Sequence, residues 1–210
     1  MDRIDIRPAC VADAPIIAQT IAMAMGEECA ALLCGPEYMK VLEQVAMAEG
    51  TQYSFKNALI AEVDGVAVGA AAGYDGARLS TLRNGTLAVI SRYYNSAQIP
   101  EDETGAGEFY IDFIGVLPQW RGCGVGKRLT IAMVGKGLVQ ECGKVGLLLD
   151  FGNSGAAALY SQCGFQSVGE KLFFGHKMRH LQCSHLPAVG KIQYTGLNYP
   201  QVQEFCGDKI

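Results

Sequence analysis

Hydrophobic and polar positions along the chain predict a succession of strands and helices. Strands are predicted where apolar and polar residues alternate or short apolar runs occur, and helices where apolar residues recur at helical spacing. In chain order, the pattern predicts a strand at 3–7, helices at 12–25 and 36–49, strands at 58–63 and 66–74, a weaker helix at 79–94, a strand at 108–117, a helix at 125–142, a strand at 144–151, a helix at 154–163 and strands at 166–168 and 171–181. Asp64-Gly65, between two of these strands, is typical of a hairpin turn.

The order of these elements predicts the fold class. Strand, turn, helix and strand follow one another in the second half of the chain, which is typical of an α/β fold with a mixed sheet and helices packed on it. We expect one domain over residues 1–181. Residues 182–210 are less periodic and contain Pro187 and Pro200, so we expect an appendage that packs on the domain or on a partner.

Composition and charge narrow the classes of function. Of the 210 residues, 50% are hydrophobic, which is enough for a sizeable core. The formal net charge is −4, so the composition does not indicate a nucleic-acid binder, and no apolar stretch is long enough to span a membrane. The 8 cysteines are scattered without a C-x-x-C pair, and the N-terminal residues lack the apolar run of a signal peptide. We therefore expect a reducing, cytoplasmic location.

A glycine-rich segment with basic residues, QWRGCGVGKRL at 119–129, follows a predicted strand and begins a predicted helix. Its spacing excludes two well-known phosphate loops. A P-loop would need glycine at 121 and serine or threonine at 128, where the chain has Arg121 and Arg128. A dinucleotide-binding G-x-G-x-x-G would need its third glycine where Lys127 or Leu129 stands.

The remaining pattern is a strand, Pro118 and then R-G-x-G-x-G at the start of a helix. Backbone N–H groups at a helix N-terminus are unpaired and lie at the positive end of the helix dipole, and glycines let an anion approach the backbone closely. Arg121, Lys127 and Arg128 add positive charge. The segment therefore predicts an anion site that suits a pyrophosphate, with a turn of solvated cations as the alternative.

Three short segments resemble one known family. Pro118-x-x-Arg121-Gly122-x-Gly124-x-Gly126 resembles the acetyl-CoA loop of the GNAT superfamily of N-acetyltransferases. The preceding Ile114-Gly115-Val116 is similar to the end of that family's fourth strand. Asn153, followed by Leu159-Tyr160 and Gly164-Phe165, resembles its later helix segment, and the order of the elements matches from Ile4 to about Leu181.

The resemblance implies a GNAT-like fold, with a mixed, mainly antiparallel central sheet flanked by helices on both faces and splayed between strands 4 and 5. It also implies acetyl-CoA as co-substrate, with the pantetheine arm and thioester oxygen on backbone N–H groups around Gly115. Gly115 suits a bulge there, since glycine within a strand often marks one. The residues that the resemblance implies in acetyl-CoA binding are Ile114, Gly115, Val116, Arg121, Gly122, Cys123, Gly124, Val125, Gly126, Lys127, Asn153 and Tyr160.

Two of these residues have a second interpretation. Tyr160 takes the family's general-acid position, from which its hydroxyl would protonate the departing thiolate, while a place in the core is the alternative. Asn153 would bond the pantetheine arm, but an asparagine before a helix is also an ordinary N-cap.

The resemblance does not settle which group takes the amine proton, because family members do not share one base position. Glu108, Tyr110 and Asp112 share one face of the predicted strand by its period of two. An aspartate within the apolar run YIDFI costs desolvation unless it is paired or used. We predict Asp112 as the base, on the same face as Ile114, and Glu108 as second choice; a role of Asp112 in bonding backbone or a substrate cation stays open.

Cysteine and histidine offer two further candidates, both of which we set aside. Cys123 lies at a helix N-terminus, where a thiolate would be stabilised, but no histidine is near in sequence to act as its base. The histidines fall in His176-x-x-x-His180-x-x-Cys183-x-His185, which one could interpret as a zinc site. This spacing matches no closed site on a strand, so we expect no metal.

These observations together predict an acetyltransferase that moves an acetyl group from acetyl-CoA directly to a primary amine of a small molecule or peptide. The alternative is a non-catalytic acyl-CoA-binding or regulatory module of the same fold. The expected partners are acetyl-CoA and an amine acceptor, and a homodimer stays open. Glu27-Glu28 and Glu101-Asp102-Glu103 fit a cationic acceptor, but we interpret them as ordinary solvated surface.

Overall fold

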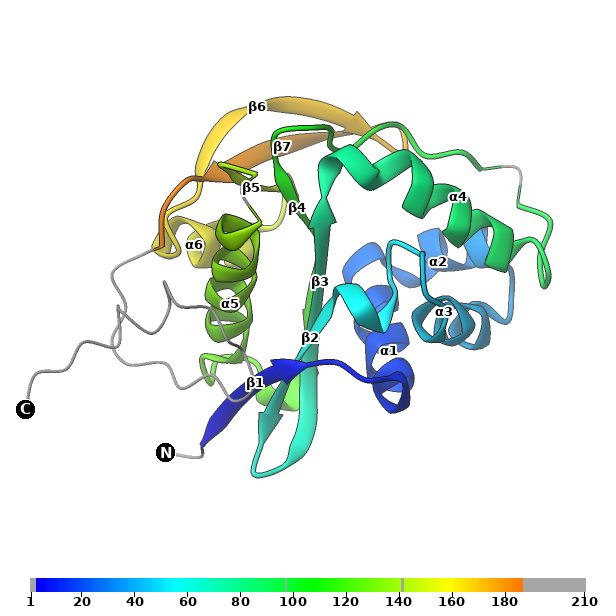
Figure 1. The fold of residues 1–210 in the computed structure, drawn as a ribbon, viewed down its shortest axis with the longest axis horizontal. Helices are drawn as coiled ribbons and strands as arrows, with labels where there is room; N and C mark the ends of the chain where they lie inside the picture. The colour runs from blue at the N-terminus through cyan, green and yellow to red at the C-terminus, as the bar shows by residue number, and fades with distance from the viewer. Residues whose placement is uncertain (1–2, 97, 141, 187–210) are drawn as a thin grey trace, which may run out of the picture.

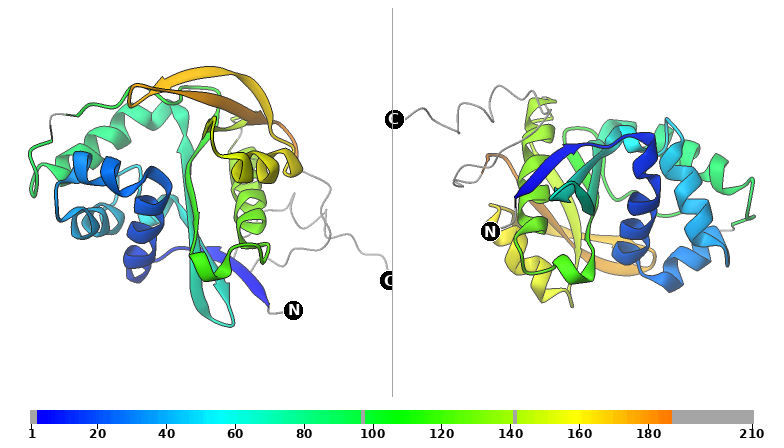
Figure 2. Two further views of the ribbon diagram at one scale, coloured as in Figure 1. Left: turned by 180° about the vertical axis from the view of Figure 1, so that it is seen from behind. Right: turned by 90° about the horizontal axis from the view of Figure 1, so that it is seen from below.

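The computed structural model describes residues 3–96, 98–140 and 142–186, and these form one sheet with helices on both of its faces (Figures 1 and 2). The strands and helices are β1 (Ile4–Pro8), α1 (Ala14–Met25), α2 (Glu27–Cys34), α3 (Tyr38–Met47), β2 (Ala58–Val63), β3 (Val66–Asp75), α4 (Leu79–Ile90), β4 (Phe109–Val116), α5 (Val125–Val139), β5 (Val145–Asp150), α6 (Ser154–Gln162), β6 (Gln166–Phe173) and β7 (His176–Cys183). Short 3-10 turns precede several of them, at Val11–Asp13, Phe55–Asn57, Gly76–Arg78 and Pro118–Trp120.

The seven strands lie in the order β1-β2-β3-β4-β5-β7-β6. Every neighbouring pair is antiparallel except β4 and β5, which are parallel. This parallel pair is short, because only Phe109 with Val145 and Tyr110 with Gly146 are in register. Beyond Tyr110 the two strands separate. The predicted fold class, including the splay between strands 4 and 5, is therefore confirmed.

Two hydrophobic clusters hold the layers together. α5 and α6 cover one face of the sheet, where Phe109, Ile111 and Leu129 belong to one cluster (Figure 1). α1, α2 and α3 cover the other face, where Phe113 packs with residues of these helices. Burying one such side chain stabilises a fold by about 1.5–3 kcal/mol. The two clusters fix β4 between the helix layers, and β4 is the strand whose free edge faces the splay.

A β-bulge in β4 corrects the predicted faces of that strand. Ala72 and Gly73 are consecutive in β3, but they pair with Phe113 and Ile111, so Asp112 is the extra residue. Gly115, where we expected a bulge, pairs regularly with Ala70. Because a bulge breaks the period of two, Asp112 does not share a face with Ile114 as predicted: Phe113 packs toward α1–α3, and Ile114 packs toward α5.

Other predicted boundaries are also wrong. The pattern assigned no element to residues 26–35, yet α2 forms there between two glycines of positive φ, Gly26 and Gly35. The closing hairpin turns at Phe174-Gly175, not near Gly169, because both turn residues have the positive φ that a tight hairpin turn needs. β7 ends at Cys183, beyond the predicted strand end at 181. The domain limit of 181 stays a prediction, and residues 187–210 of the predicted appendage lie outside the described residues.

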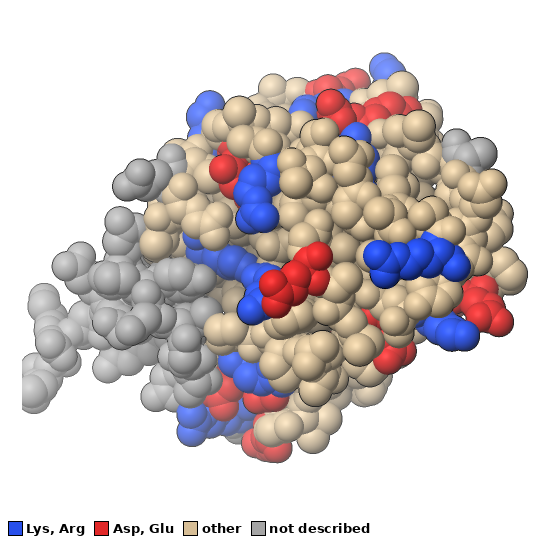
Figure 3. All heavy atoms as spheres, turned by 45° about the vertical axis from the view of Figure 1, so that its right-hand side comes forward, with Lys and Arg blue, Asp and Glu red and all other residues tan. Residues whose placement is uncertain are grey.

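The outer surface shows no single dominant charge on the face drawn in Figure 3. Basic and acidic side chains are interspersed there, with wide uncharged areas between them. No single described helix is long and apolar enough to cross a membrane. Among the described residues, Val11–Met25 and α2 taken together are long and apolar enough to span a membrane by length and composition alone, but the two segments are bent by 112° where they meet.

Candidate active site

The glycine-rich loop leads into the N-terminus of α5 with the geometry of an anion site. Gly122 and Gly124 have φ of 79° and 86°, a region in which residues with a Cβ are strained. The first helical bond of this segment runs from the Arg128 N–H to the Gly124 carbonyl. The N–H groups of residues 122–127 have no hydrogen-bond partner within the described part of the chain. They remain available to phosphate oxygens at the positive end of the helix dipole.

The basic side chains of the loop do not all face this anion site. Arg121 donates a hydrogen bond from Nε to the carbonyl of Val116 at 3.2 Å, and this bond connects the loop to the end of β4. Arg128 instead donates from Nη1 to the Ile4 carbonyl at 3.1 Å, on β1, so its side chain is engaged outside the loop, and its contribution of charge to the anion site stays a prediction. Cys123 is exposed, and its Sγ lies 3.8 Å from the Arg121 carbonyl.

The three segments that resemble one family meet in space. A Cβ added to Gly126 of α5 would lie 3.4 Å from Cδ2 of Leu159 in α6 and 3.8 Å from Cγ2 of Val116 in β4. Ile114 and Tyr160 pack against the same hydrophobic cluster. The predicted binding residues around the loop, β4 and α6 therefore form one contiguous region.

The free edge of β4 lies where β5 separates from it. Ile114, Gly115 and Val116 pair with β3 through one edge, and no register with β5 extends past Tyr110. A Cβ on Gly115 would approach Cβ of Thr20 to 2.5 Å. Glycine at 115 therefore allows α1 to pack closely on β4 beside the splay, which is a different reason from the predicted bulge.

Tyr160 lies on α6, and Asn153 is the residue just before this helix. The Tyr160 ring contacts the Phe165 ring at a centroid distance of 5.7 Å, and burial raises the pKa of its hydroxyl to about 12. This phenol stays protonated at neutral pH, as a proton donor must. Asn153 accepts a hydrogen bond from the Ala156 N–H at 3.0 Å, so its predicted N-cap role is confirmed, while its contact with pantetheine stays a prediction.

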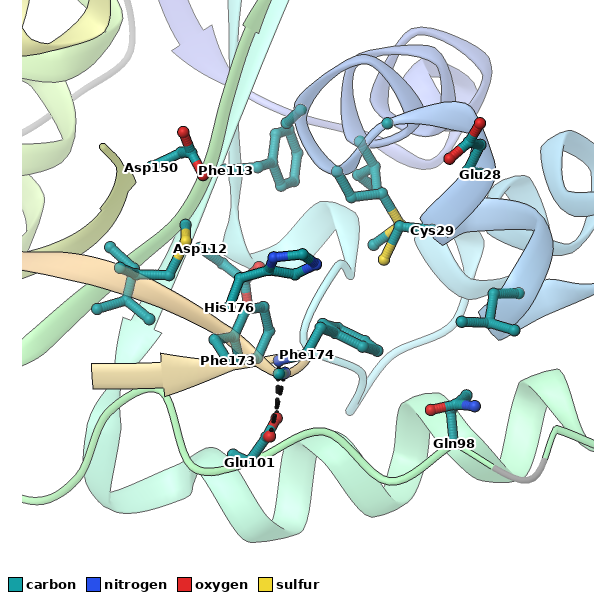
Figure 4. A pocket seen from close by; sticks show the side chains of 18 of the residues that line it. Glu28, Cys29, Gln98, Glu101, Asp112, Phe113, Asp150, Phe173, Phe174 and His176 are labelled. Carbon is teal, nitrogen blue, oxygen red and sulfur yellow. Dashed lines mark hydrogen bonds between the residues drawn. The ribbon is translucent and has the colours of Figure 1, made fainter. Parts of the chain in front are cut away.

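A cavity of about 1230 Å³ lies on the other side of β4, between α1, α2, the segment 98–101, β5 and the β6–β7 hairpin (Figure 4). Its walls are partly apolar, with Phe113, Phe173 and Phe174 among them. The acidic residues that line it are Glu27, Glu28, Glu101, Asp112 and Asp150. No lysine or arginine is among the described residues of this lining. Tyr160 does not line it, so the phenol and Asp112 approach the splay from opposite faces of the sheet.

The bulge residue Asp112 is the carboxylate at the inner end of this cavity. Its Oδ2 accepts hydrogen bonds from the Tyr74 hydroxyl at 2.8 Å and from Nε2 of Gln52 at 3.3 Å. Burial, and next the negative charge of Glu103, raise the pKa of Asp112 to about 7. A carboxylate with a pKa near the working pH is suited to accept a proton, because both of its protonation states are accessible.

Similarity to known proteins agrees with this geometry. The model of the acetyltransferase (GNAT) family matches residues 32–165, more than half of the chain. The protein belongs to the GNAT family. No curated protein sequence matches the chain.

Solved structures show the same fold as this GNAT protein. An acetyltransferase of 25% identity matches 85% of this chain and 98% of its own with a TM-score of 0.74. An N-acetyltransferase from Staphylococcus aureus Mu50, 22% identical, matches 84% of this chain and 98% of its own with a TM-score of 0.73. PaiA N-acetyltransferase from Thermoplasma acidophilum, in complex with coenzyme A, is 12% identical over 87% of this chain and 99% of its own, with a TM-score of 0.51. The family identifies the chain as an acetyl-CoA-dependent acyltransferase.

Glu108, the second candidate for the base in this GNAT protein, lies apart from the cavity. It accepts hydrogen bonds from Thr104 at 2.7 Å and Gln182 at 2.8 Å and contacts Nε2 of His180 at 2.8 Å. Burial alone would raise the pKa of Glu108, but the hydrogen bonds with His180, Thr104 and Gln182 lower it below the ordinary value. The Glu108 carboxylate packs directly on Gly146 of β5, where a Cβ would overlap it. Through this contact and its bonds to β7, Glu108 links the start of β4 to β5 and β7, at the end where β4 and β5 are paired.

The predicted histidine cluster is not a single site. His180 bonds Glu108, while the Cys183 thiol lies 2.9 Å from the carbonyl of His185 and 3.7 Å from that of Cys163. His176 instead lines the large cavity. Within the described residues, no group of three histidine, cysteine, aspartate or glutamate side chains is placed to hold a metal ion.

Sequence reasoning missed the side chains that surround Asp112. Gln52, Tyr74 and Glu103 come from separate parts of the chain, and no motif joins them. The available signal was Arg83, a cation in the predicted helix that precedes the acidic run at 101–103 and lies 19 residues before Asp102. The interpretation of that run as plain solvated surface is wrong for Glu103, which is 2% exposed and paired with Arg83.

Proposed function

We propose that this protein transfers the acetyl group of acetyl-CoA directly to a primary amine of a small molecule or peptide. The main support is the position of Asp112, a carboxylate with a pKa of about 7 in the wall of a large cavity beside the separated strands β4 and β5. A site that only bound acyl-CoA would have no use for such a group. The non-catalytic module is therefore the weaker hypothesis.

The residues of this chain supply each proton transfer of the proposed reaction. Asp112 takes one proton from the ammonium form of the acceptor, and the amine nitrogen then attacks the thioester carbonyl carbon. Backbone N–H groups at the free edge of β4, around Gly115, would stabilise the negative oxygen that forms. When the carbon–sulfur bond breaks, Tyr160 gives its proton to the departing thiolate. The acylated nitrogen then loses its remaining extra proton, which returns to the Tyr160 phenolate directly or through water, so that the amide is neutral and the phenol is restored. The bound acetyl-CoA supplies the activated acetyl group, and the N–H groups of residues 122–127 would hold its pyrophosphate.

We further propose that the acceptor is cationic. Glu27, Glu28, Glu101 and Asp150 are exposed in the wall of the cavity, and the half-buried Asp112 lies deeper, on β4. Carboxylates without basic residues among them attract and orient a protonated amine. The aromatic and aliphatic remainder of the lining suits an acceptor that also has an apolar part.

A thiol-release assay tests the proposed function. Acetyl-CoA and the purified protein are incubated with polyamines, aminoglycosides, amino acids and peptides with free N-termini. We expect thiol release with at least one cationic amine, and none when its amino groups are blocked by prior acetylation. If acetyl-CoA binds but no amine raises thiol release above hydrolysis, the non-catalytic module is the better description.

Substitution of Gly124 by valine is expected to weaken acetyl-CoA binding by about tenfold or more. The left-handed conformation at φ 86° is strained for valine, so the backbone N–H groups next to it shift. Losing one hydrogen bond to a charged phosphate costs about 1.5–3 kcal/mol, and each 1.4 kcal/mol is a factor of about ten in affinity. Calorimetry with acetyl-CoA measures the change.

Gly50→Val is the matched control for this substitution. Gly50 also has a positive φ, of 78°, lies after a helix, and leaves open space for a Cβ, but it is remote from the loop. It should lose similar stability and keep its acetyl-CoA affinity. Unchanged affinity in a folded Gly124→Val protein would show that the loop is not the pyrophosphate site.

A further inference from the structure

A buried carboxylate, Glu103, and a half-buried one, Asp112, share the same two hydrogen-bond donors. Oε1 of Glu103 accepts from Nε2 of Gln52 at 2.9 Å and from the Tyr74 hydroxyl at 3.2 Å. Oδ2 of Asp112 accepts from the same Nε2 at 3.3 Å and the same hydroxyl at 2.8 Å. The amide of Gln52 has two protons, but the Tyr74 hydroxyl has only one, so it can serve only one carboxylate at a time.

Arg83 of α4 holds the second carboxylate in place. It pairs through Nη2 with Oε2 of Glu103 and through Nη1 with Oδ1 of Asp102 at 2.6 Å. Its Nη2 also donates to the carbonyl of Glu101 at 2.9 Å. Arg83 and Glu103 are both buried, with 9% and 2% of their surfaces exposed. Such an ion pair stabilises the charge of a buried carboxylate and fixes its position.

We propose that Glu103 is a positioning residue for the proton transfer by Asp112: held by Arg83, it competes for the donors that would stabilise the Asp112 carboxylate and so makes Asp112 a stronger base. The inference rests on the proposed function, in which Asp112 accepts the amine proton. It extends the active site to a residue that touches neither acetyl-CoA nor the acceptor.

Electrostatics acts in the same direction as the competition for donors. A second negative charge nearby disfavours ionisation of Asp112, because two carboxylates repel each other strongly in a buried setting. Burial is the largest cause of the raised pKa of Asp112, and the charge of Glu103 is the next, while the bonds from Tyr74 and Gln52 and the charge of Arg83 oppose them.

The other titratable groups around Asp112 do not replace Glu103 in this role. Tyr53 and Tyr110 are buried phenols whose pKa values are raised by burial, so they are uncharged at neutral pH. Glu101, Asp150, His176 and Cys29 line the same cavity, which is open to solvent. Within the described part of the chain, none of these side chains hydrogen-bonds with Gln52 or Tyr74, the two donors of Asp112, as Glu103 does.

Two substitutions are expected to move the titration of Asp112 in opposite directions. Glu103→Gln keeps the shape and one acceptor oxygen but removes the charge, so the pKa of Asp112 should fall by about one unit or more. Tyr74→Phe removes a hydrogen bond that stabilises the ionised form, so the pKa should rise. NMR of the side-chain carboxyl signals of 13C-labelled aspartate, followed over pH in the free protein, measures the pKa of Asp112 directly. The signal of Asp112 is identified as the one that is lost in Asp112→Asn.

Asp102→Asn is the matched control. Asp102 is another acidic partner of Arg83, but its side chain is 78% exposed and contacts neither Gln52 nor Tyr74. Its substitution should leave the titration of Asp112 near wild type. A comparable shift in this control would mean that any change of charge near Arg83 has the same effect, which contradicts a specific role of Glu103.

The pH profile of kcat/KM then separates this inference from the proposed function. In Glu103→Gln, the acid limb should move to lower pH together with the carboxyl signal, and the plateau should fall because the base is weaker. If the Asp112 signal does not move, the inference is wrong whatever the activity. If the signal moves but turnover does not depend on Asp112, the role of Asp112 as base is wrong. A lowered or unchanged pKa in Tyr74→Phe overturns the shared-donor arrangement even if the Glu103 variant cannot be purified.

Discussion

Replacing Tyr160 with phenylalanine is expected to lower kcat by about 10- to 10⁴-fold, while the affinity for acetyl-CoA changes little. The hydroxyl is the only group lost, and the ring keeps its contact with Phe165 and with the cluster around α5. Because burial raises the pKa of Tyr160 to about 12, this phenol keeps its proton and is available as a donor to the thiolate as the carbon–sulfur bond breaks. Because that interaction exists only late in the reaction, kcat and kcat/KM should fall together.

The identity of the leaving thiol provides a sharper test of this role. An acetyl thioester of a more acidic thiol needs less help from a proton donor, so the deficit of Tyr160→Phe should shrink with such a donor. Tyr38→Phe, in α3, is the control for losing a tyrosine hydroxyl on a helix away from the loop and α6. Full activity of the Tyr160 variant with acetyl-CoA would assign Tyr160 to the core alone.

Local patterns in the sequence were sufficient to predict the loop and the capped helix where we propose that acetyl-CoA binds. The loop from Arg121 to Lys127 and the helix with Asn153 and Tyr160 each lie within about ten residues, so turn glycines, a cap and a motif can be recognised together. In the proposed site the backbone would do most of the binding, and its geometry follows directly from the glycines.

The acceptor side depends on contacts between distant segments, which no local pattern reveals. Asp112 faces the cavity because one extra residue in β4 interrupts the alternation, and alternation was the basis for predicting its face. Its partners Gln52, Tyr74 and Glu103 come from a loop, β3 and the segment before β4. α2, which supplies Glu27 and Glu28 to the cavity, is too short for helical periodicity to be clear.

Substitution of Asp112 by asparagine is expected to change the shape of the pH–rate profile as well as its height. In the wild type, kcat/KM should rise with pH and level off above about 7, where Asp112 becomes ionised and can take the amine proton. The variant has no base, so only the fraction of acceptor that is already unprotonated reacts. Its rate should keep rising about tenfold per pH unit toward the pKa of the amine, near 10 for an alkylamine.

The deficit of the Asp112 variant therefore has a defined size and pH dependence. At and below pH 7 we expect a loss of about 10²- to 10⁴-fold, the usual contribution of a general base, and the loss should shrink steadily at higher pH. If Asp112 only bound the substrate cation, the KM for the acceptor would rise while kcat at saturation stayed near wild type.

Glu108→Gln is the parallel variant, because Glu108 was the second candidate for the base. Because Glu108 bonds His180 and Gln182 outside the cavity, its profile should keep the plateau above pH 7. The reverse result, a lost plateau in Glu108→Gln and an unchanged profile in Asp112→Asn, would assign the base to Glu108.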